Sequence, residues 1–121
     1  MSREIRRVAV LGAGTMGHGI AQVAAMAGYD VALRDTTREL VDRGLDRIRQ
    51  NLDEGVERGK VSPEERAAAL DRLRGETELG AAVEGADLVI EAVPERFDLK
   101  VEVFGSSRRT SRPMRSSRRT P

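Results

Sequence analysis

A glycine-rich hexapeptide near the N-terminus constrains the fold of this chain more than any other feature. Gly12-Ala-Gly-Thr-Met-Gly17 separates a short apolar run from a helical pattern. The apolar run consists of Ile5 and Val8-Ala-Val-Leu11, and it is typical of a parallel strand that is buried on both faces. After the glycines, apolar residues recur at helical spacing until Gly28, where a helix would stop; they are Met16, Ile20, Val23, Ala24 and Ala27. The segment therefore predicts a strand, a tight turn and a helix whose buried face carries these residues.

Strand and helix patterns go on alternating after this segment. We expect a second short strand over 30–35 and a long amphipathic helix over 38–58, because apolar residues follow one another there at near-constant four-residue steps. Ser62-Pro-Glu-Glu65 matches a capping box and predicts another helix, running to about Arg74. The remaining expected elements are a brief third strand over 76–79, a turn of helix over 81–84 and a strongly apolar fourth strand over 86–93. This alternation favours a parallel sheet covered by helices on both faces, the doubly wound α/β class of Rossmann type.

Composition separates the chain into two unlike parts. Residues 106–121 hold six arginines, no acid and one hydrophobic residue, so this Arg/Ser-rich tail cannot pack a core and is expected to be disordered. The preceding residues are net acidic, with no footprint for a nucleic acid or a membrane. No signal peptide and no apolar run of about 20 residues is apparent, which predicts a cytoplasmic protein. We expect a partial domain over 1–105 and a separate tail over 106–121.

The glycine turn and an acid downstream predict a dinucleotide site. Gly12 permits the tight turn, Gly14 lets the backbone approach a pyrophosphate, and Gly17 allows close packing of the helix. The amides of the loop and of the first helical turn, those of Ala13, Thr15 and Met16 included, would face the phosphates. They lie at the positive end of the helix dipole. Asp35, which ends the second strand, can accept hydrogen bonds from ribose hydroxyls and would repel a 2′-phosphate. The pattern thus favours NAD over NADP, although the same glycines could serve only as turn and packing residues.

Candidates for catalysis and for metal binding are scarce. The chain has no cysteine and a single histidine, so we expect no metal site. His18 lies in the first turn of the predicted helix, far from the place where a nicotinamide would react, and we interpret it as a helix surface residue. No catalytic residue is therefore assigned.

Two longer stretches point to a family. Gly12–Gln22, Asp87-Leu-Val-Ile-Glu-Ala-Val-Pro-Glu95 and Lys100 together resemble the N-terminal domain of 3-hydroxyacyl-CoA dehydrogenases, the 3-hydroxybutyryl-CoA enzymes included. The resemblance covers residues 5–105 and implies oxidation of a 3-hydroxyacyl-CoA to the 3-ketoacyl-CoA with NAD in fatty acid metabolism and β-oxidation. It also implies an acyl-CoA substrate, homodimeric full-length enzymes and cofactor contacts by Glu95 and Lys100, which could alternatively form only a solvated ion pair.

The same resemblance makes the long helix a candidate for contact with the CoA moiety. The residues concerned are Asn51, Arg58 and Lys60, and their alternative interpretation is a solvated helix face.

Beyond residue 105 the resemblance ends. The tail carries Ser-Ser-Arg-Arg-Thr twice and none of the family's later features, such as its catalytic histidine, which a frameshift would explain. We therefore expect no turnover from this chain, and a fourth strand left as an uncovered apolar edge over 88–93. Alternatives that stay open are a stand-alone NAD-binding module without catalysis, another dehydrogenase type with a glycine-rich start and, least favoured for want of aromatic residues, a nucleic-acid-binding tail.

Overall fold

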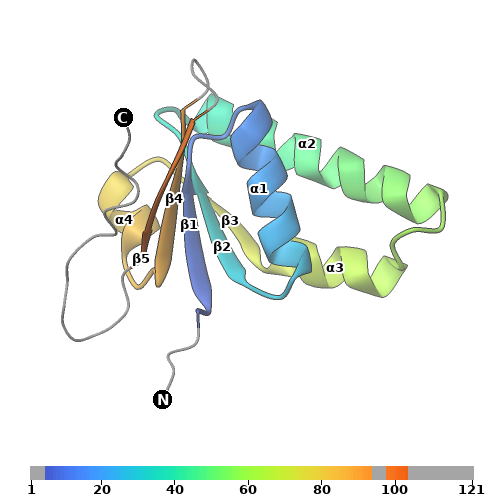
Figure 1. Ribbon diagram of the computed structural model, residues 1–121. Helices are drawn as coiled ribbons and strands as arrows, with labels where there is room; N and C mark the ends of the chain where they lie inside the picture. The colour runs from blue at the N-terminus through green and yellow to red at the C-terminus, as the bar shows by residue number, and fades with distance from the viewer. Residues whose placement is uncertain (1–4, 94–97, 104–121) are drawn as a thin grey trace.

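A single five-stranded sheet organises the chain (Figure 1). The computed structural model describes residues 5–93 and 98–103, so the predicted disorder of 106–121 lies outside the described residues. The strands stand in the order β3-β2-β1-β4-β5. Their bounds are β1 Arg7–Leu11, β2 Asp30–Arg34, β3 Leu73–Glu76, β4 Leu88–Val93 and β5 Asp98–Val103. The helices are α1 Thr15–Met26, α2 Arg38–Glu57, α3 Pro63–Asp71 and α4 Leu79–Val83.

The sheet is doubly wound, as the alternation predicts. β1 to β4 are parallel, and β1 lies between β2 and β4 because the chain reverses its direction of travel across the sheet after β3. Helices α1, α2 and α3 lie on one face and α4 on the other (Figure 1). The central strands are buried on both sides, with Val8, Val10 and Leu33 in the main core and Ala9 in a smaller cluster with Val89. The fold class is therefore α/β of Rossmann type.

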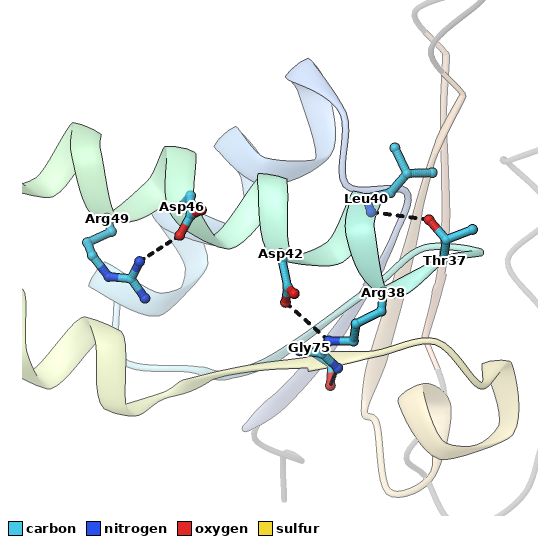
Figure 2. Close-up of polar contacts among 7 residues, drawn as sticks. All are labelled: Thr37, Arg38, Leu40, Asp42, Asp46, Arg49 and Gly75. Carbon is cyan, nitrogen blue, oxygen red and sulfur yellow. Dashed lines mark hydrogen bonds and ion pairs between the residues drawn. The ribbon is translucent and has the colours of Figure 1, made fainter.

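Helix α2 starts where local chemistry predicts. The hydroxyl of Thr37 accepts a hydrogen bond from the amide of Leu40 at 3.2 Å (Figure 2), which satisfies one of the first-turn donors. Ion pairs follow along the exposed side; Nε of Arg38 lies 3.1 Å from Oδ1 of Asp42, a contact drawn in Figure 2. Such exposed pairs contribute little, at most about 1 kcal/mol each. The stability of α2 comes instead from its apolar stripe, of which Val41, Ile48 and Leu52 are fully buried.

The capping box of α3 is confirmed, but the two elements around it shift. Ser62 and Glu65 exchange hydrogen bonds of 2.9 and 3.0 Å. The helix ends at Asp71 instead of about Arg74, and β3 spans Leu73–Glu76 instead of 76–79. The expected positions were wrong because Leu73-Arg-Gly-Glu76 has no strand pattern of its own. It is a strand because Leu73 pairs with Val31 in β2, and because Gly75 has no side chain to block the approach of α2.

The buried face of α1 also differs from the prediction. The buried residues are Gly17, Ala21 and Ala25, whereas Val23 is 68% exposed. Small residues face the sheet because they allow the helix axis to come close to it. The larger apolar residues predicted to be buried, Met16 to Ala27, instead line an open groove beside the helix.

β4 is not the uncovered edge that the sequence suggested. β5 runs antiparallel to it, with Leu88 opposite Val103 and Ile90 opposite Val101. A missed signal explains the error: apolar Leu99, Val101 and Val103 alternate with charged residues, which is the period of a half-buried strand. The sheet is therefore mixed, and within the described residues its two edge strands are β3 and β5.

Within the described ranges, no helix is both long enough and apolar enough to cross a membrane.

Candidate functional site

The glycine turn lies at the carboxyl end of β1, between its two neighbouring strands. The amide of Gly12 donates to the carbonyl of Arg34 at 2.7 Å, which ties the turn to the end of β2. Gly12 has φ +109°, and a β-carbon built on it would lie 2.9 Å from the carbonyl oxygen of Ala92 in β4. A side chain at this position would be strained and would also clash. The fold itself therefore requires glycine at residue 12.

Gly17 and Gly14 differ in what surrounds them. A β-carbon on Gly17 would overlap the carbonyl oxygen of Gly12, so glycine here lets the first turn of α1 sit against the loop. A β-carbon on Gly14 would meet nothing within 4 Å. The backbone of Gly14 is extended, at φ −72° and ψ −157°, a conformation open to other residues. Nothing within the described structure therefore requires glycine at residue 14.

The start of α1 offers unpaired donors beside Gly14. Gly14 is the N-cap of the helix and has no side chain that could accept a hydrogen bond from the first-turn amides. The amides of Thr15, Met16 and Gly17 have no partner in an α-helix, since they precede the first i to i−4 bond. With the helix dipole, they form a positive end that suits an anion. Gly14 and Thr15 are both exposed, so a ligand can reach them.

Asp35 lies next to the same loop. Its Oδ2 accepts a hydrogen bond from the amide of Ala13 at 2.8 Å, and its Oδ1 accepts one from the amide of Thr36 at 2.7 Å. These bonds hold the half-buried carboxylate in one orientation at the carboxyl end of β2. The hydroxyl of Thr36 also donates to Oδ1, at 3.4 Å. Oδ2 can accept a further hydrogen bond, and Oδ1 can do so when the Thr36 hydroxyl turns away. The structure thus brings the predicted loop residues and Asp35 together.

Arg34, which directly precedes Asp35, and His18 both have local partners. The Nε of Arg34 donates to the carbonyl of Thr77 at 3.0 Å, so this guanidinium is held at the end of β3. His18 is half-buried, with its Nδ1 2.9 Å from the carbonyl oxygen of Gly14. That contact ties the ring to the glycine loop.

Gly44 supports the loop and was not identified from the sequence. It lies in α2, and a β-carbon on it would be 2.9 Å from the carbonyl oxygen of Ala13 and 3.1 Å from Cδ2 of Leu33. The absence of a side chain at Gly44 therefore allows α2 to approach Ala13, whose amide donates a hydrogen bond to Asp35. A signal was present, because a glycine inside a predicted helix costs about 1 kcal/mol relative to alanine and usually has a packing reason.

The two predicted cofactor contacts after the fourth strand have different outcomes. Glu95 lies outside the described residues. Lys100 lies in β5 opposite Glu91, and its Nζ is 4.0 Å from Oε1 of Glu91, with both side chains about half exposed. Glu91 in turn pairs with Leu11, so Lys100 is near the edge that carries the glycine turn.

The predicted CoA contacts are not gathered around the loop. The amide of Asn51 donates to Oε1 of Gln22 at 3.0 Å and so joins α2 to α1. Arg58 and Lys60 are exposed at the end of α2, which projects away from the sheet (Figure 1). Whether they contact a substrate stays a prediction.

The donors and acceptors around Gly14 fit a dinucleotide. The exposed amides match a pyrophosphate, the empty space at Gly14 admits it, and the fixed Asp35 carboxylate matches two ribose hydroxyls. The groups needed for a metal ion are missing from the part of the chain that the structure describes, where no three metal-ligating side chains come together.

Comparison with known proteins agrees with this geometry. The family model of the 3-hydroxyacyl-CoA dehydrogenase NAD-binding domain matches residues 7–114. A 3-hydroxybutyryl-CoA dehydrogenase of Mycobacterium tuberculosis is 43% identical over 104 residues, which are 86% of this chain and 36% of that protein. A 3-hydroxyadipyl-CoA dehydrogenase of Escherichia coli is also 43% identical, over 86% of this chain and 22% of its own length.

Solved structures resemble the fold as well. The crystal structure of (S)-3-hydroxybutyryl-CoA dehydrogenase from Ralstonia eutropha matches with a TM-score of 0.71 and 37% identity, over 74% of this chain and 31% of that one. The chain thus spans roughly a third or less of the relatives it matches. On these grounds it belongs to the family of the 3-hydroxyacyl-CoA dehydrogenase NAD-binding domain.

Proposed function

We propose that this chain binds NAD at the glycine turn and is the cofactor-binding part of an enzyme that oxidises 3-hydroxyacyl-CoA to 3-ketoacyl-CoA. One observation carries the proposal: glycine at residue 14 has no steric or conformational reason within the fold, yet it leaves open space next to unpaired helix amides. Close approach of a phosphate-bearing ligand is the reason that remains.

The residues divide the recognition of NAD between them. The amides of Gly14 to Gly17 would hold the pyrophosphate, and Asp35 would accept hydrogen bonds from the adenosine ribose. The charge of Asp35 disfavours a ribose 2′-phosphate, and Arg34 is engaged by Thr77, so NAD is the expected cofactor in preference to NADP. When bound, NAD accepts the hydride from the substrate carbon.

We further propose that the chain does not turn over a substrate by itself. Removal of the hydroxyl proton needs a base near the nicotinamide. The only histidine, His18, contacts the carbonyl of Gly14 at the phosphate end of the site. The proposal also includes an acyl-CoA substrate, with contacts from Asn51, Arg58 and Lys60. It further includes a role in fatty acid metabolism, a cytoplasmic location and a domain division at residue 105.

Calorimetric titration of the 121-residue protein with NAD and NADP tests the binding. We expect saturable NAD binding, with NADP weaker by at least about tenfold, which is about 1.4 kcal/mol. In a parallel assay with 3-hydroxybutyryl-CoA and NAD, no NADH should appear. Absence of NAD binding by a folded protein would contradict the proposed function, and formation of NADH would contradict the proposed inactivity.

A second candidate is a stand-alone NAD-binding module without catalysis. It is favoured by β5, which pairs with β4 along Leu88–Val93 and removes the apolar edge expected of a cut domain. Cooperative unfolding of the isolated chain, together with NAD binding, would support this candidate. Aggregation of the isolated chain would favour a part of a larger enzyme.

A further inference from the structure

An open apolar groove runs along the flank of α1 that faces β4. Its volume is about 560 Å³, and none of the residues that line it is charged. One wall belongs to α1, with lining residues from Met16 to Ala27, and the other belongs to β4, with Leu88 and Ile90. The groove therefore follows α1 over its whole length.

Both rims of this groove carry exposed apolar side chains. On the helix side, Val23 is 68% exposed. On the sheet side, Val103 of β5 is 48% exposed and lies opposite Leu88, so the two side chains leave the sheet on the same face. Contiguous apolar surface of this kind is typical of a contact that is made with another element or another chain.

The groove lies where one more helix would complete the layer on this face of the sheet. Helix α1 contacts α2 and α3 on its other flank, and no helix of the described residues covers β4 and β5 on this face (Figure 1). Axes of packed helices are about 8–10 Å apart, and neighbouring strands are about 4.8 Å apart. A helix packed against the open flank of α1 would thus lie two strands further on, over β4 and β5.

We propose that this groove is the docking site of an amphipathic α-helix from the part of the dehydrogenase that this chain does not span. The inference rests on the proposed function, and the chain covers roughly a third or less of the relatives it matches. The docked helix would be about three turns long, to match the 12 residues of α1. It would turn an uncharged apolar stripe, at three- and four-residue spacing, toward the groove and its polar side toward water.

The two exposed rims favour a helix over an alkyl chain as the occupant. An alkyl chain that lay between α1 and β4 would be too thin to cover Val23 and Val103. A helix with its side chains is about 10 Å across, and it would reach both rims. The occupant that removes all of this apolar surface from water is therefore a helix.

A second copy of this chain is a poorer match for the groove. The apolar stripe of α2 is already buried within its own fold, through Val41, Ile48 and Leu52. Helices α3 and α4 have only nine and five residues, which is less than three turns. Among the described helices, a second copy could offer only α1 itself, whose smallest residues face its own sheet.

Protection of a single thiol tests the docking site, because the chain has no native cysteine. Val23→Cys places a thiol at the helix rim, and the matched control Leu79→Cys places one at an exposed position of α4, on the opposite face of the sheet. The probe is the Mycobacterium tuberculosis 3-hydroxybutyryl-CoA dehydrogenase without the 104 residues that match this chain, co-expressed with each 121-residue variant.

We expect the probe to slow maleimide labelling of the Val23→Cys variant at least about tenfold, because a thiol that is covered in most molecules reacts only from the open remainder. Labelling of the Leu79→Cys variant should not change.

Lysine substitutions at the two rims test which surfaces the helix contacts. Val23→Lys and Val103→Lys should each raise the dissociation constant of the probe at least about thirtyfold, because an unpaired ammonium would enter an apolar contact. Leu79→Lys, the matched control, should have no effect. All three positions are exposed in the chain alone, so the urea midpoint of each variant should stay at the parent value, which separates docking from folding.

Several results would overturn the proposal. One is equal labelling of Val23→Cys with and without the co-expressed probe. Protection that rises with the concentration of the chain alone would identify a second copy as the occupant, and protection by dodecanoate alone would identify an alkyl ligand. NAD titration distinguishes these results from a failure of the proposed function. Val23 is eight residues, or about 12 Å, from Thr15 along α1, so Val23→Lys should bind NAD as the parent does.

Discussion

Gly14→Ala should separate ligand binding from folding. The extended backbone at residue 14 suits alanine, and the added methyl would meet nothing within 4 Å. A glycine to alanine change at such a position stabilises a protein by about 0.4–1 kcal/mol, through the entropy of the unfolded chain. The methyl would nevertheless stand where the pyrophosphate must approach. We therefore expect NAD affinity to fall at least about tenfold, or about 1.4 kcal/mol, with no loss of stability.

Gly17→Ala is the matched control, because it makes the same chemical change three residues away. Its methyl would overlap the carbonyl oxygen of Gly12, and relief of such overpacking costs about 1–3 kcal/mol. Urea unfolding followed by far-UV circular dichroism measures the stability of both variants, and calorimetry measures NAD binding.

The reasoning fails if Gly14→Ala binds NAD as tightly as the parent protein. It also fails if Gly14→Ala is destabilised as much as Gly17→Ala, since residue 14 would then be a packing position.

Three further substitutions probe the surroundings of the loop. Asp35→Asn keeps an acceptor for Ala13 but removes the charge, so NAD affinity should fall about fivefold and discrimination against NADP should shrink; an unchanged ratio of the two affinities would contradict this role. Gly44→Ala should lower the free energy of unfolding by about 1–3 kcal/mol because α2 must move away from Ala13, and an unchanged urea midpoint would argue against the close approach. Ser62→Ala should cost about 1 kcal/mol by removing the cap of α3, while calorimetry should show NAD affinity unchanged.

Elements with strong local signals were predictable from the sequence. Strand β1 and the helix after the glycines follow from an apolar run and a turn, and α3 starts at Ser62 because the capping box is a local interaction. The proximity of the glycine turn to Asp35 followed from the same local logic, since the spacing of Gly12, Gly14 and Asp35 relates the ends of two adjacent strands.

Features that depend on distant partners were not predictable. Strand β3 has little pattern of its own and exists through its pairing with β2. The prediction of which face of α1 is buried was wrong. Its smallest residues, Gly17, Ala21 and Ala25, approach the sheet, whereas hydrophobicity alone favours burial of the larger ones. The role of Gly44 required knowing that α2 crosses over Ala13.

The place of β1 between β2 and β4 has a consequence for how the chain acquires its structure during synthesis. On the β2 side, Arg7 pairs with Asp30. On the β4 side, the amide of Arg7 donates to the carboxylate of Asp87, which is 80 residues downstream. At about 5–20 residues per second, a ribosome needs roughly 4–16 s to make that stretch. During that time the central strand has one edge open, although the first strand, glycine turn and helix are already available. We therefore expect the pairing of β4 with β1 to be a late step in folding, because the loop-closure entropy of that long excursion is lost only then.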